Sequence, residues 1–204
     1  MITNHVDAIE RIVLKKDPNI PIVVIREHLL RYILALDSVT NKDVLDVGCG
    51  SGYGMYLMSY FAKSVSGYDY SQEAIDEAKK FSYKCDCNLE IRNLEEDRPL
   101  NNHKHSKFDI VTCFETIEHI KNPEILLKNI RDVLNPKGIA YISTPNDIKH
   151  TDKNKWHKVH FDFYSLFNLI KEVFNDPKVE FFGQDQWGLT KDFTKPYIIA
   201  KIEL

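Results

Sequence analysis

Residues 43–54, DVLDVGCGSGYG, decide the fold. The first half is a short apolar run typical of a buried strand. Half of the 8 glycines in this 204-residue chain follow at alternate positions: Gly48, Gly50, Gly52 and Gly54. Glycine loses the most conformational freedom on folding, so it is placed where the backbone must turn sharply or where something approaches closely. The stretch therefore predicts a strand followed by a tight turn that is open to a ligand.

The composition is that of an ordinary globular protein. Hydrophobic residues make up 43% of the chain and charged residues 28%, and 204 residues suffice for one domain with a sizeable core. The formal net charge of −3 provides no broad positive field. Nucleic acid is therefore not a favoured partner, and a small molecule is expected instead.

The cysteines and the N-terminus indicate a cytoplasmic protein. Only two of the four cysteines, Cys85 and Cys87, are close in sequence, and their one-residue gap differs from the two-residue gap of most zinc and redox pairs. The first 17 residues carry charges throughout, unlike a signal peptide, and no apolar run approaches a membrane span. We expect reduced thiols and no membrane segment, with the oligomeric state left open.

Strand and helix patterns alternate from the glycine stretch to residue 144. This alternation predicts a parallel sheet with helices on both faces, and such sheets bind ligands beyond the carboxyl ends of their strands. Ser71 is expected to cap one of the helices. The expected strands are 44–47, 64–69, 88–93, 108–114 and 138–144, and the expected helices are 52–63, 72–81 and 123–134.

The flanking segments complete a single domain over 1–204. Two helices, 5–16 and 23–37, form an N-terminal helical cap over 1–40, and residues 43–144 form the cofactor-binding core. The substrate-side segment 145–204 contains a polar loop (145–160), a helix (163–174) and two strands (178–184 and 195–204). We expect an α/β, Rossmann-like fold with a seven-stranded, mostly parallel sheet, whose last two strands form an antiparallel hairpin at one edge.

Three kinds of nucleotide site compete for the glycine turn. A dinucleotide turn requires a third glycine where this chain has Tyr53, and a phosphate-binding P-loop requires a lysine that is absent. An adenosylmethionine loop, in which an acidic residue precedes G-x-G-x-G, matches every position from Asp46 to Gly52. Asp46 would repel a pyrophosphate but suits a ligand with an ammonium and a sulfonium group. The loop amides are expected to receive the carboxylate of that ligand.

Asp69 ends the second expected strand, twenty-one residues after Gly48. A carboxylate at this place accepts both ribose hydroxyls in dinucleotide sites, so Asp69 indicates a nucleoside ligand without choosing which. The alternative is an aspartate that only supports the helix start at Ser71.

On these residues the chain resembles the class I S-adenosylmethionine-dependent methyltransferases. The stretches VLDVGCGSGYG and SGYDYSQEAIDEAKK resemble the first two motifs of that family. FDIVTCFETIEHIKNPEILLKNIRDVLNPKGIAYISTPN resembles a branch that holds the ubiquinone-biosynthesis O-methyltransferases and the type 11 and 23 methyltransferase domains. The resemblance implies S-adenosyl-L-methionine as cofactor and S-adenosyl-L-homocysteine as product, with no indication of the acceptor.

The resemblance also implies which residues hold the cofactor. The methionine part is expected against the glycine loop, and Asp69 on the ribose, with Tyr70 beside the adenine. Asn93 stands where the family often has an aspartate that bonds the adenine amino group, and Leu94 follows it. The expected contacts of the methionine part are Asp46, Gly48, Cys49, Gly50 and Gly52.

Four further residues are expected to adjoin the methionine part. Phe114 and Glu115 end the fourth expected strand, where the cofactor and substrate pockets meet. Arg31 and Tyr32 are expected to cover the methionine carboxylate, with ordinary helix packing as the alternative.

The segment ETIEHI places Glu115, Glu118 and His119 on one face of an expected helix. With His157 and His160 from the polar loop, three roles compete. His119, Glu115 and His160 are expected to be catalytic, a histidine serving as general base. The second role is a divalent-cation site made by Glu115, Glu118, His119 and His160, which we do not favour. The third is a purely structural turn.

The expected reaction is methyl transfer to an oxygen or nitrogen of a small molecule, such as a sugar, a phenol or a quinone-like metabolite. The aromatic residues Tyr53, Phe114, Trp156 and Phe161 are expected to line an apolar pocket under a lid formed by 145–160. The alternatives are a metal-assisted RNA 2′-O-methyltransferase, a nicotinamide-dependent oxidoreductase, and a non-catalytic protein that keeps the cofactor.

Overall fold

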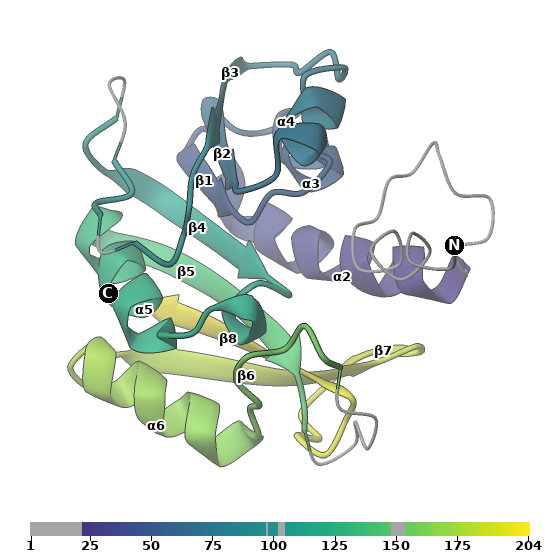
Figure 1. Cartoon of the computed structure of the whole chain (residues 1–204), viewed down its shortest axis with the longest axis vertical. Coiled ribbons are helices and arrows are strands. Elements are labelled where there is room, and N and C mark those ends of the chain that lie inside the picture. Colours follow the sequence, from purple (N-terminus) through teal and green to yellow (C-terminus); the bar gives the residue numbers. More distant parts are fainter. Residues whose placement is uncertain (1–21, 97, 102–104, 148–153) are drawn as a thin grey trace.

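The computed structural model describes residues 22–96, 98–101, 105–147 and 154–204 (Figure 1). The expected helix 5–16 lies outside the described residues. The helices are α2 (Ile22–Val39), α3 (Tyr53–Met58), α4 (Gln72–Ala78), the 3-10 turn η1 (Ile117–His119), α5 (Pro123–Val133) and α6 (Phe163–Val173). The strands are β1 (Asp43–Val47), β2 (Ser64–Asp69), β3 (Asp86–Ile91), β4 (Phe108–Phe114), β5 (Leu134–Pro145), β6 (Lys178–Asp185), β7 (Gly188–Thr190) and β8 (Tyr197–Glu203).

The described strands form one sheet in the order β3-β2-β1-β4-β5-β8-β6-β7. The first five are parallel to one another, and β8 pairs antiparallel with both β5 and β6. The predicted Rossmann-like, mostly parallel sheet with antiparallel C-terminal strands is therefore confirmed. The sheet has eight strands rather than seven, because the sequence analysis missed the short strand β7. This strand, rather than the β6–β8 pair, occupies the edge.

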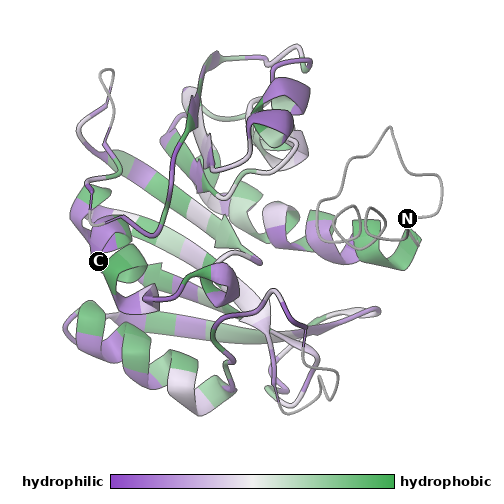
Figure 2. Cartoon of the chain, in the orientation of Figure 1, coloured by the Kyte–Doolittle hydropathy of each residue, from purple (hydrophilic) through white to green (hydrophobic). Residues whose placement is uncertain are grey.

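Helices cover both faces of the sheet, as Figure 1 shows, with α2, α3 and α4 on one side and α5 and α6 on the other. Each face has its own hydrophobic cluster. Leu126 and Ile130 of α5 pack with Leu166 of α6 in one cluster, and Met55 of α3 packs with Ile75 of α4 in the other. In Figure 2, α5 and α6 carry both hydrophobic and hydrophilic residues, as expected for helices with one face on a sheet.

Local signals set several helix boundaries. Ser71 caps α4 as predicted, since its side chain accepts a hydrogen bond from the amide of Ala74. Pro123 is at the first turn of α5, where its missing N–H costs nothing. Asp162 and Ser165 form a reciprocal capping box at the start of α6.

Two predicted boundaries were wrong by four residues or more. The helix expected over 52–63 ends at Met58, and the Ser59 hydroxyl donates back to the Tyr56 carbonyl. The stretch 135–137, expected to be only a helix stop, is already part of β5. The pairing of β5 with β4 shifts register there, and Lys137 has a left-handed φ of 66°. Such an irregularity lets the chain leave α5 and enter the strand without a separate loop.

The carboxyl ends of the parallel strands bring the predicted motifs to one edge of the sheet. The glycine turn follows β1, Asp69 ends β2, Glu115 follows β4, and Pro145 ends β5. None of the helices in the described part of the chain has both the length and the hydropathy needed to cross a bilayer.

Candidate active site

The glycines of the turn serve different purposes. Gly48, Gly50 and Gly52 all have left-handed φ values, of 76°, 52° and 80°. A Cβ added to Gly48 would lie 2.2 Å from Oγ1 of Thr116, and one added to Gly52 would lie 2.6 Å from Cβ of Ala78. A Cβ on Gly50 would meet nothing within 4 Å. Gly48 and Gly52 are therefore required by packing within the protein, whereas Gly50 borders open space.

Most loop amides are already bonded within the protein. The amides of Gly48 and Cys49 donate to the Tyr68 carbonyl, at 2.8 and 3.0 Å, and the Gly52 amide donates to the Cys49 carbonyl. The Gly50 amide donates to Oδ2 of Asp69 at 2.9 Å. The turn uses these four amides to hold its own shape, and a contact between the loop amides and the carboxylate of a ligand stays a prediction. Cys49 is buried, and burial raises the pKa of its thiol.

Asp69 is held between two amides at the end of β2. Its Oδ2 accepts from Gly50, and its Oδ1 accepts from the Ser71 amide at 2.9 Å. A carboxylate oxygen has two lone pairs, so each oxygen retains the capacity for a further hydrogen bond. The neighbouring Tyr70 is 68% exposed, so its ring lies at the surface beside the strand end.

Asp46 lies beneath the loop rather than on its surface. Its two oxygens accept from the hydroxyls of Tyr32, at 3.0 Å, and Thr112, at 2.6 Å. Burial raises the pKa of Asp46 to about 7, although these hydrogen bonds act in the opposite direction. Tyr32 also fills the space that the missing side chain of Gly54 leaves open. Asp46 and Tyr32 thus support the loop from below.

The loop after β3 carries the predicted adenine contacts. Oδ1 of Asn93 accepts from the Glu95 amide at 3.1 Å, and Nδ2 of Asn93 donates to Glu96. The side chain is exposed, and its Oδ1 can accept a second hydrogen bond. Leu94 is buried in the core.

Phe114 and its aromatic neighbours form a wall between α2 and the ends of the strands. The Phe114 ring meets Tyr32 edge-on, with centroids 5.0 Å apart, and Tyr32 meets Tyr53 in the same way at 5.5 Å. Phe161 is buried, and Trp156 remains 43% exposed. These are the four aromatic residues predicted to line a pocket; of the expected lid, 148–153 lies outside the described residues.

Arg31 of α2 is fully buried, with 0% of its surface exposed. Its Nη1 lies 3.5 Å from Oε1 of Glu115, and its guanidinium carbon lies 4.4 Å from the centre of the Tyr197 ring. Nη1 and Nη2 make no hydrogen bond with any of the residues that the structure describes. Glu115 balances part of the Arg31 charge. A buried guanidinium whose two terminal nitrogens make no hydrogen bond is nevertheless costly, and it is suited to an anionic ligand.

The segment after β4 differs from the predicted helix. Glu115 has a left-handed φ of 48°, and only Ile117–His119 form a single 3-10 turn. The prediction that Glu115, Glu118 and His119 share a helix face was therefore wrong. Glu115 accepts a hydrogen bond from the Ser143 hydroxyl at 2.7 Å, next to Arg31. Its partners are thus different from those of Glu118 and His119.

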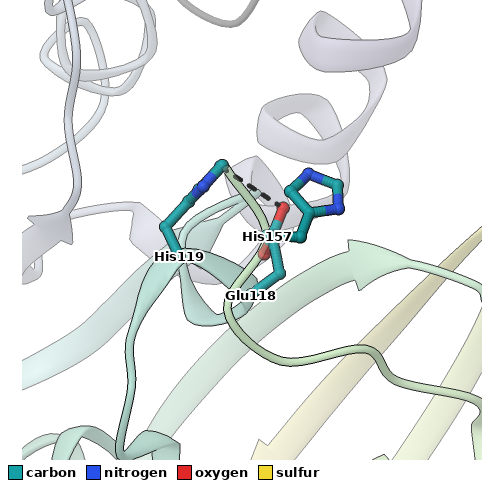
Figure 3. Close-up of side chains that lie close together, drawn as sticks. All are labelled: Glu118, His119 and His157. Carbon is teal, nitrogen blue, oxygen red and sulfur yellow. Dashed lines mark ion pairs between the residues drawn. The ribbon is translucent and has the colours of Figure 1, made fainter. Parts of the chain in front are cut away.

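Glu118, His119 and His157 come together instead, as Figure 3 shows. One ligand atom from each lies within 4.8 Å of the others, and Nε2 of His119 is 4.0 Å from Oε1 of Glu118. Nδ1 of His119 donates to the Trp156 carbonyl at 3.2 Å, which leaves Nε2 unprotonated in the neutral ring. Glu118 is 2% exposed and neither oxygen has a hydrogen-bond partner among the described residues. Burial raises its pKa well above the usual value, so the neutral acid is favoured.

A pocket lies beside this cluster. Nδ1 of His160 is 3.0 Å from Oδ1 of Asp147, a hydrogen bond in which a neutral imidazole donates and keeps Nε2 as an acceptor. The lining of the pocket is Glu118, Thr144, Pro145, Asp147, His157, Val159, His160 and Phe161. The sequence analysis named His160 but missed Asp147, whose signal was a carboxylate placed just beyond the carboxyl end of a strand.

Comparisons with known proteins agree with this geometry. The family described as "Methyltransferase domain" matches residues 23–174, which is most of the chain. The chain belongs to this methyltransferase family. Its cofactor is therefore S-adenosyl-L-methionine, and S-adenosyl-L-homocysteine is the corresponding product.

Individual relatives are more distant. The ubiquinone biosynthesis O-methyltransferase of Coxiella burnetii is 32% identical over 126 residues, which cover 62% of this chain and 53% of that protein. The chain thus spans about half the length of this curated relative.

Solved methyltransferases share the fold. The small RNA methyltransferase HEN1 superposes with a TM-score of 0.71 at 20% identity, over 86% of this chain and 25% of that one. The N-methyltransferase NodS of Bradyrhizobium japonicum, solved with S-adenosyl-L-homocysteine, gives 0.66 at 14% identity, over 93% and 89%.

The residues of this chain fit the methyltransferase cofactor. The open space beside Gly50 leaves room for a ligand against bare backbone. The carboxylate of Asp69 can accept hydrogen bonds from hydroxyl groups, and the terminal nitrogens of Arg31, which make no hydrogen bond with the described residues, suit a carboxylate. A ribose and an α-carboxylate are two of the polar groups of S-adenosyl-L-methionine.

Proposed function

We propose that this methyltransferase moves a methyl group from S-adenosyl-L-methionine to an oxygen or nitrogen of a small molecule. The observation that carries the proposal is the pocket at the strand ends, where the His160–Asp147 pair lies in the lining. The name of the Coxiella relative, a ubiquinone biosynthesis O-methyltransferase, supports a small phenol-like acceptor. The net charge of −3 also favours a small molecule over RNA.

Each part of the cofactor has proposed partners in the chain. The methionine part would lie against Gly50, with its carboxylate toward the terminal nitrogens of Arg31. The ribose hydroxyls would donate to Asp69, whose two oxygens are held in place by backbone amides. The adenine would lie between Tyr70 and the loop at Asn93, whose Oδ1 can accept from the amino group. When bound, the cofactor supplies an electrophilic methyl group on a positively charged sulfur.

His160 is the proposed general base. An imidazole titrates near neutrality, and a carboxylate on its Nδ1–H fixes the ring orientation and leaves Nε2 to accept a proton. Asp147 supplies that carboxylate. His119 and Glu115, the other predicted catalytic residues, have different surroundings. His119 is bonded to a backbone carbonyl, and Glu115 faces Arg31. We propose that His119 and Glu115 hold the segments around the pocket in place.

The first experiment measures methyl transfer from radiolabelled S-adenosyl-L-methionine to a catechol, a sugar and an amine. We expect transfer to at least one, and His160→Asn should lower kcat by about 100-fold or more with unchanged affinity for S-adenosyl-L-homocysteine. The matched control is His105→Asn, since His105 precedes β4 and its Nε2 lies 3.3 Å from the hydroxyl of Ser64 at the start of β2. Tight cofactor binding with no transfer to any acceptor would instead support a non-catalytic cofactor-binding protein.

A second candidate is a metal-assisted transfer, because one potential ligand atom from each of Glu118, His119 and His157 lies within 4.8 Å of the others. Two imidazoles and a carboxylate suit a divalent cation, which would hold and acidify an acceptor hydroxyl. Activity is measured in EDTA and then with added Mg²⁺ or Mn²⁺. Full activity in the chelator is the result expected for a His160 base. Loss of activity that the cation restores, and that Glu118→Gln prevents, would favour the metal.

We also propose a cytoplasmic location. No disulfide joins the cysteines in the described part of the chain, and this is typical of proteins in a reducing compartment. Fractionation of the cells that produce the protein tests this location, and recovery with the periplasmic or membrane fraction would contradict it.

A further inference from the structure

Gln184, on β6, makes an unusual connection between the C-terminal half of the sheet and α2. It is fully buried, with 0% of its surface exposed. Its Nε2 donates to the Glu27 carbonyl at 2.7 Å, and its Oε1 accepts from Nε of Arg31 at 2.8 Å. Arg31 and Gln184 are 153 positions apart in sequence. One side-chain amide therefore ties two successive turns of α2 to the sheet.

The two hydrogen bonds fix the orientation of the amide. A backbone carbonyl can only accept and a guanidinium can only donate, so Nε2 must face Glu27 and Oε1 must face Arg31. No exchange of the two groups keeps both bonds. The Gln184 side chain is thus locked, and with it the position of Nε of Arg31.

Locking Nε sets the direction of the rest of the guanidinium. The group is planar, so a bond to Nε and the Tyr197 ring against its face, with 4.4 Å from the guanidinium carbon to the ring centre, leave little freedom of rotation. The remaining nitrogens, Nη1 and Nη2, have no hydrogen-bond partner among the described residues, and Nη1 is 3.5 Å from Glu115. Those two nitrogens form a fork that is held in advance for a carboxylate.

We propose that Gln184 is a positioning residue that aims Arg31 at the carboxylate of the methionine part. This inference rests on the proposed function, since it assumes that the cofactor lies against Arg31. Without Gln184, Arg31 would retain its charge but lose its fixed direction. The binding affinity would then decrease for ligands that carry the carboxylate and stay unchanged for those that lack it.

The experiment uses calorimetry with two ligands, S-adenosyl-L-homocysteine and its decarboxylated analogue. The variant Gln184→Met replaces the amide with an apolar chain of similar length. Gln186→Met makes the same change two residues further on, at an exposed position, and is the matched control. Arg31→Met and the double variant complete a double-mutant cycle, which isolates the coupling between the two residues.

The wild-type protein is expected to prefer S-adenosyl-L-homocysteine over the decarboxylated analogue by about 100-fold, the range of a hydrogen-bonded charge pair. Gln184→Met should weaken the carboxylated ligand about 10-fold and leave the analogue unchanged, while Gln186→Met changes neither. Arg31→Met should abolish the preference, and adding Gln184→Met should then have no further effect. A role in fold stability alone would weaken both ligands together. If Gln184→Met does not unfold cooperatively, Gln184→Asn, which shortens the side chain by one methylene, replaces it.

The outcomes separate the two proposals. Failure of the wild-type protein to bind S-adenosyl-L-homocysteine would refute the cofactor site itself. Binding without any preference for the carboxylated ligand would leave that site intact and overturn the assignment of Arg31 to the cofactor. A carboxylate on the methyl acceptor would then be the remaining candidate partner of Arg31. A preference that Gln184→Met leaves at its wild-type value would overturn the role of Gln184 alone.

Discussion

Replacing Gly50 with alanine separates cofactor binding from folding. The backbone at Gly50 has a φ of 52°, a conformation that costs a residue with a Cβ about 1–2 kcal/mol. The added Cβ meets no protein atom within 4 Å, so no steric cost is added. For a chain of this length we expect the melting temperature to fall by roughly 2–8 °C, and the protein to stay folded.

The same substitution should also weaken cofactor binding. A ligand atom in contact with Cα lies about 3.7 Å from it, and the new Cβ extends about 1.5 Å into the same space. The ligand or the loop must then move, and overpacking of this kind costs about 1–3 kcal/mol. The affinity for S-adenosyl-L-homocysteine should therefore fall by roughly 5- to 150-fold.

Gly48→Ala provides the comparison. Its Cβ would lie 2.2 Å from Oγ1 of Thr116, at a φ of 76°, so this variant should lose far more stability than Gly50→Ala. Thermal unfolding and calorimetry with S-adenosyl-L-homocysteine are measured on both. Wild-type affinity in Gly50→Ala would refute the reasoning, because the open space would then not be where the ligand lies.

Three other changes have defined outcomes. Burial raises the pKa of Asp46 to about 7 from the usual 3.8, so the folded state binds this proton more tightly than the unfolded state. The contribution of Asp46 to the free energy of unfolding therefore falls as pH rises from about 4 to 7, by roughly 1.4 kcal/mol per pH unit. The stability of Asp46→Asn relative to wild type should thus increase as pH rises from about 4 to 7. Thermal unfolding of both proteins at pH 5 and 7.5 checks this, and an equal stability difference at the two pH values would contradict it. Ser71→Ala removes the α4 cap and should lower the free energy of unfolding by about 1 kcal/mol in urea unfolding. Ser82→Ala, at an exposed position, should cause no measurable change, and equal losses in the two variants would rule out a cap effect. Asp147→Asn should lower kcat but less than His160→Asn does, at unchanged cofactor affinity, and an unchanged kcat would remove Asp147 from the site.

The local structure around the candidate site could be predicted because its signals are local. The glycine turn, the carboxylate of Asp69 at a strand end and the Ser71 cap each depend on a few adjacent residues. Backbone conformation and hydrogen bonding within such a short stretch depend little on the rest of the chain. The wrong prediction for Glu115 has the same origin, since helical spacing was assumed where the chain takes a left-handed residue and a single 3-10 turn.

The sequence by itself determined the order of most strands and helices, the glycine turn and hence the family. Only the tertiary structure decided which distant side chains meet. The antiparallel insertion of β8 between β5 and β6 sets where β6 lies in the sheet, and Gln184 on β6 reaches Arg31 there. The pairing of Asp147 with His160 likewise depends on how the loop after β5 returns to the sheet. Sequence patterns report the conformation of neighbouring residues, whereas these contacts depend on sheet order and register, which no local pattern specifies.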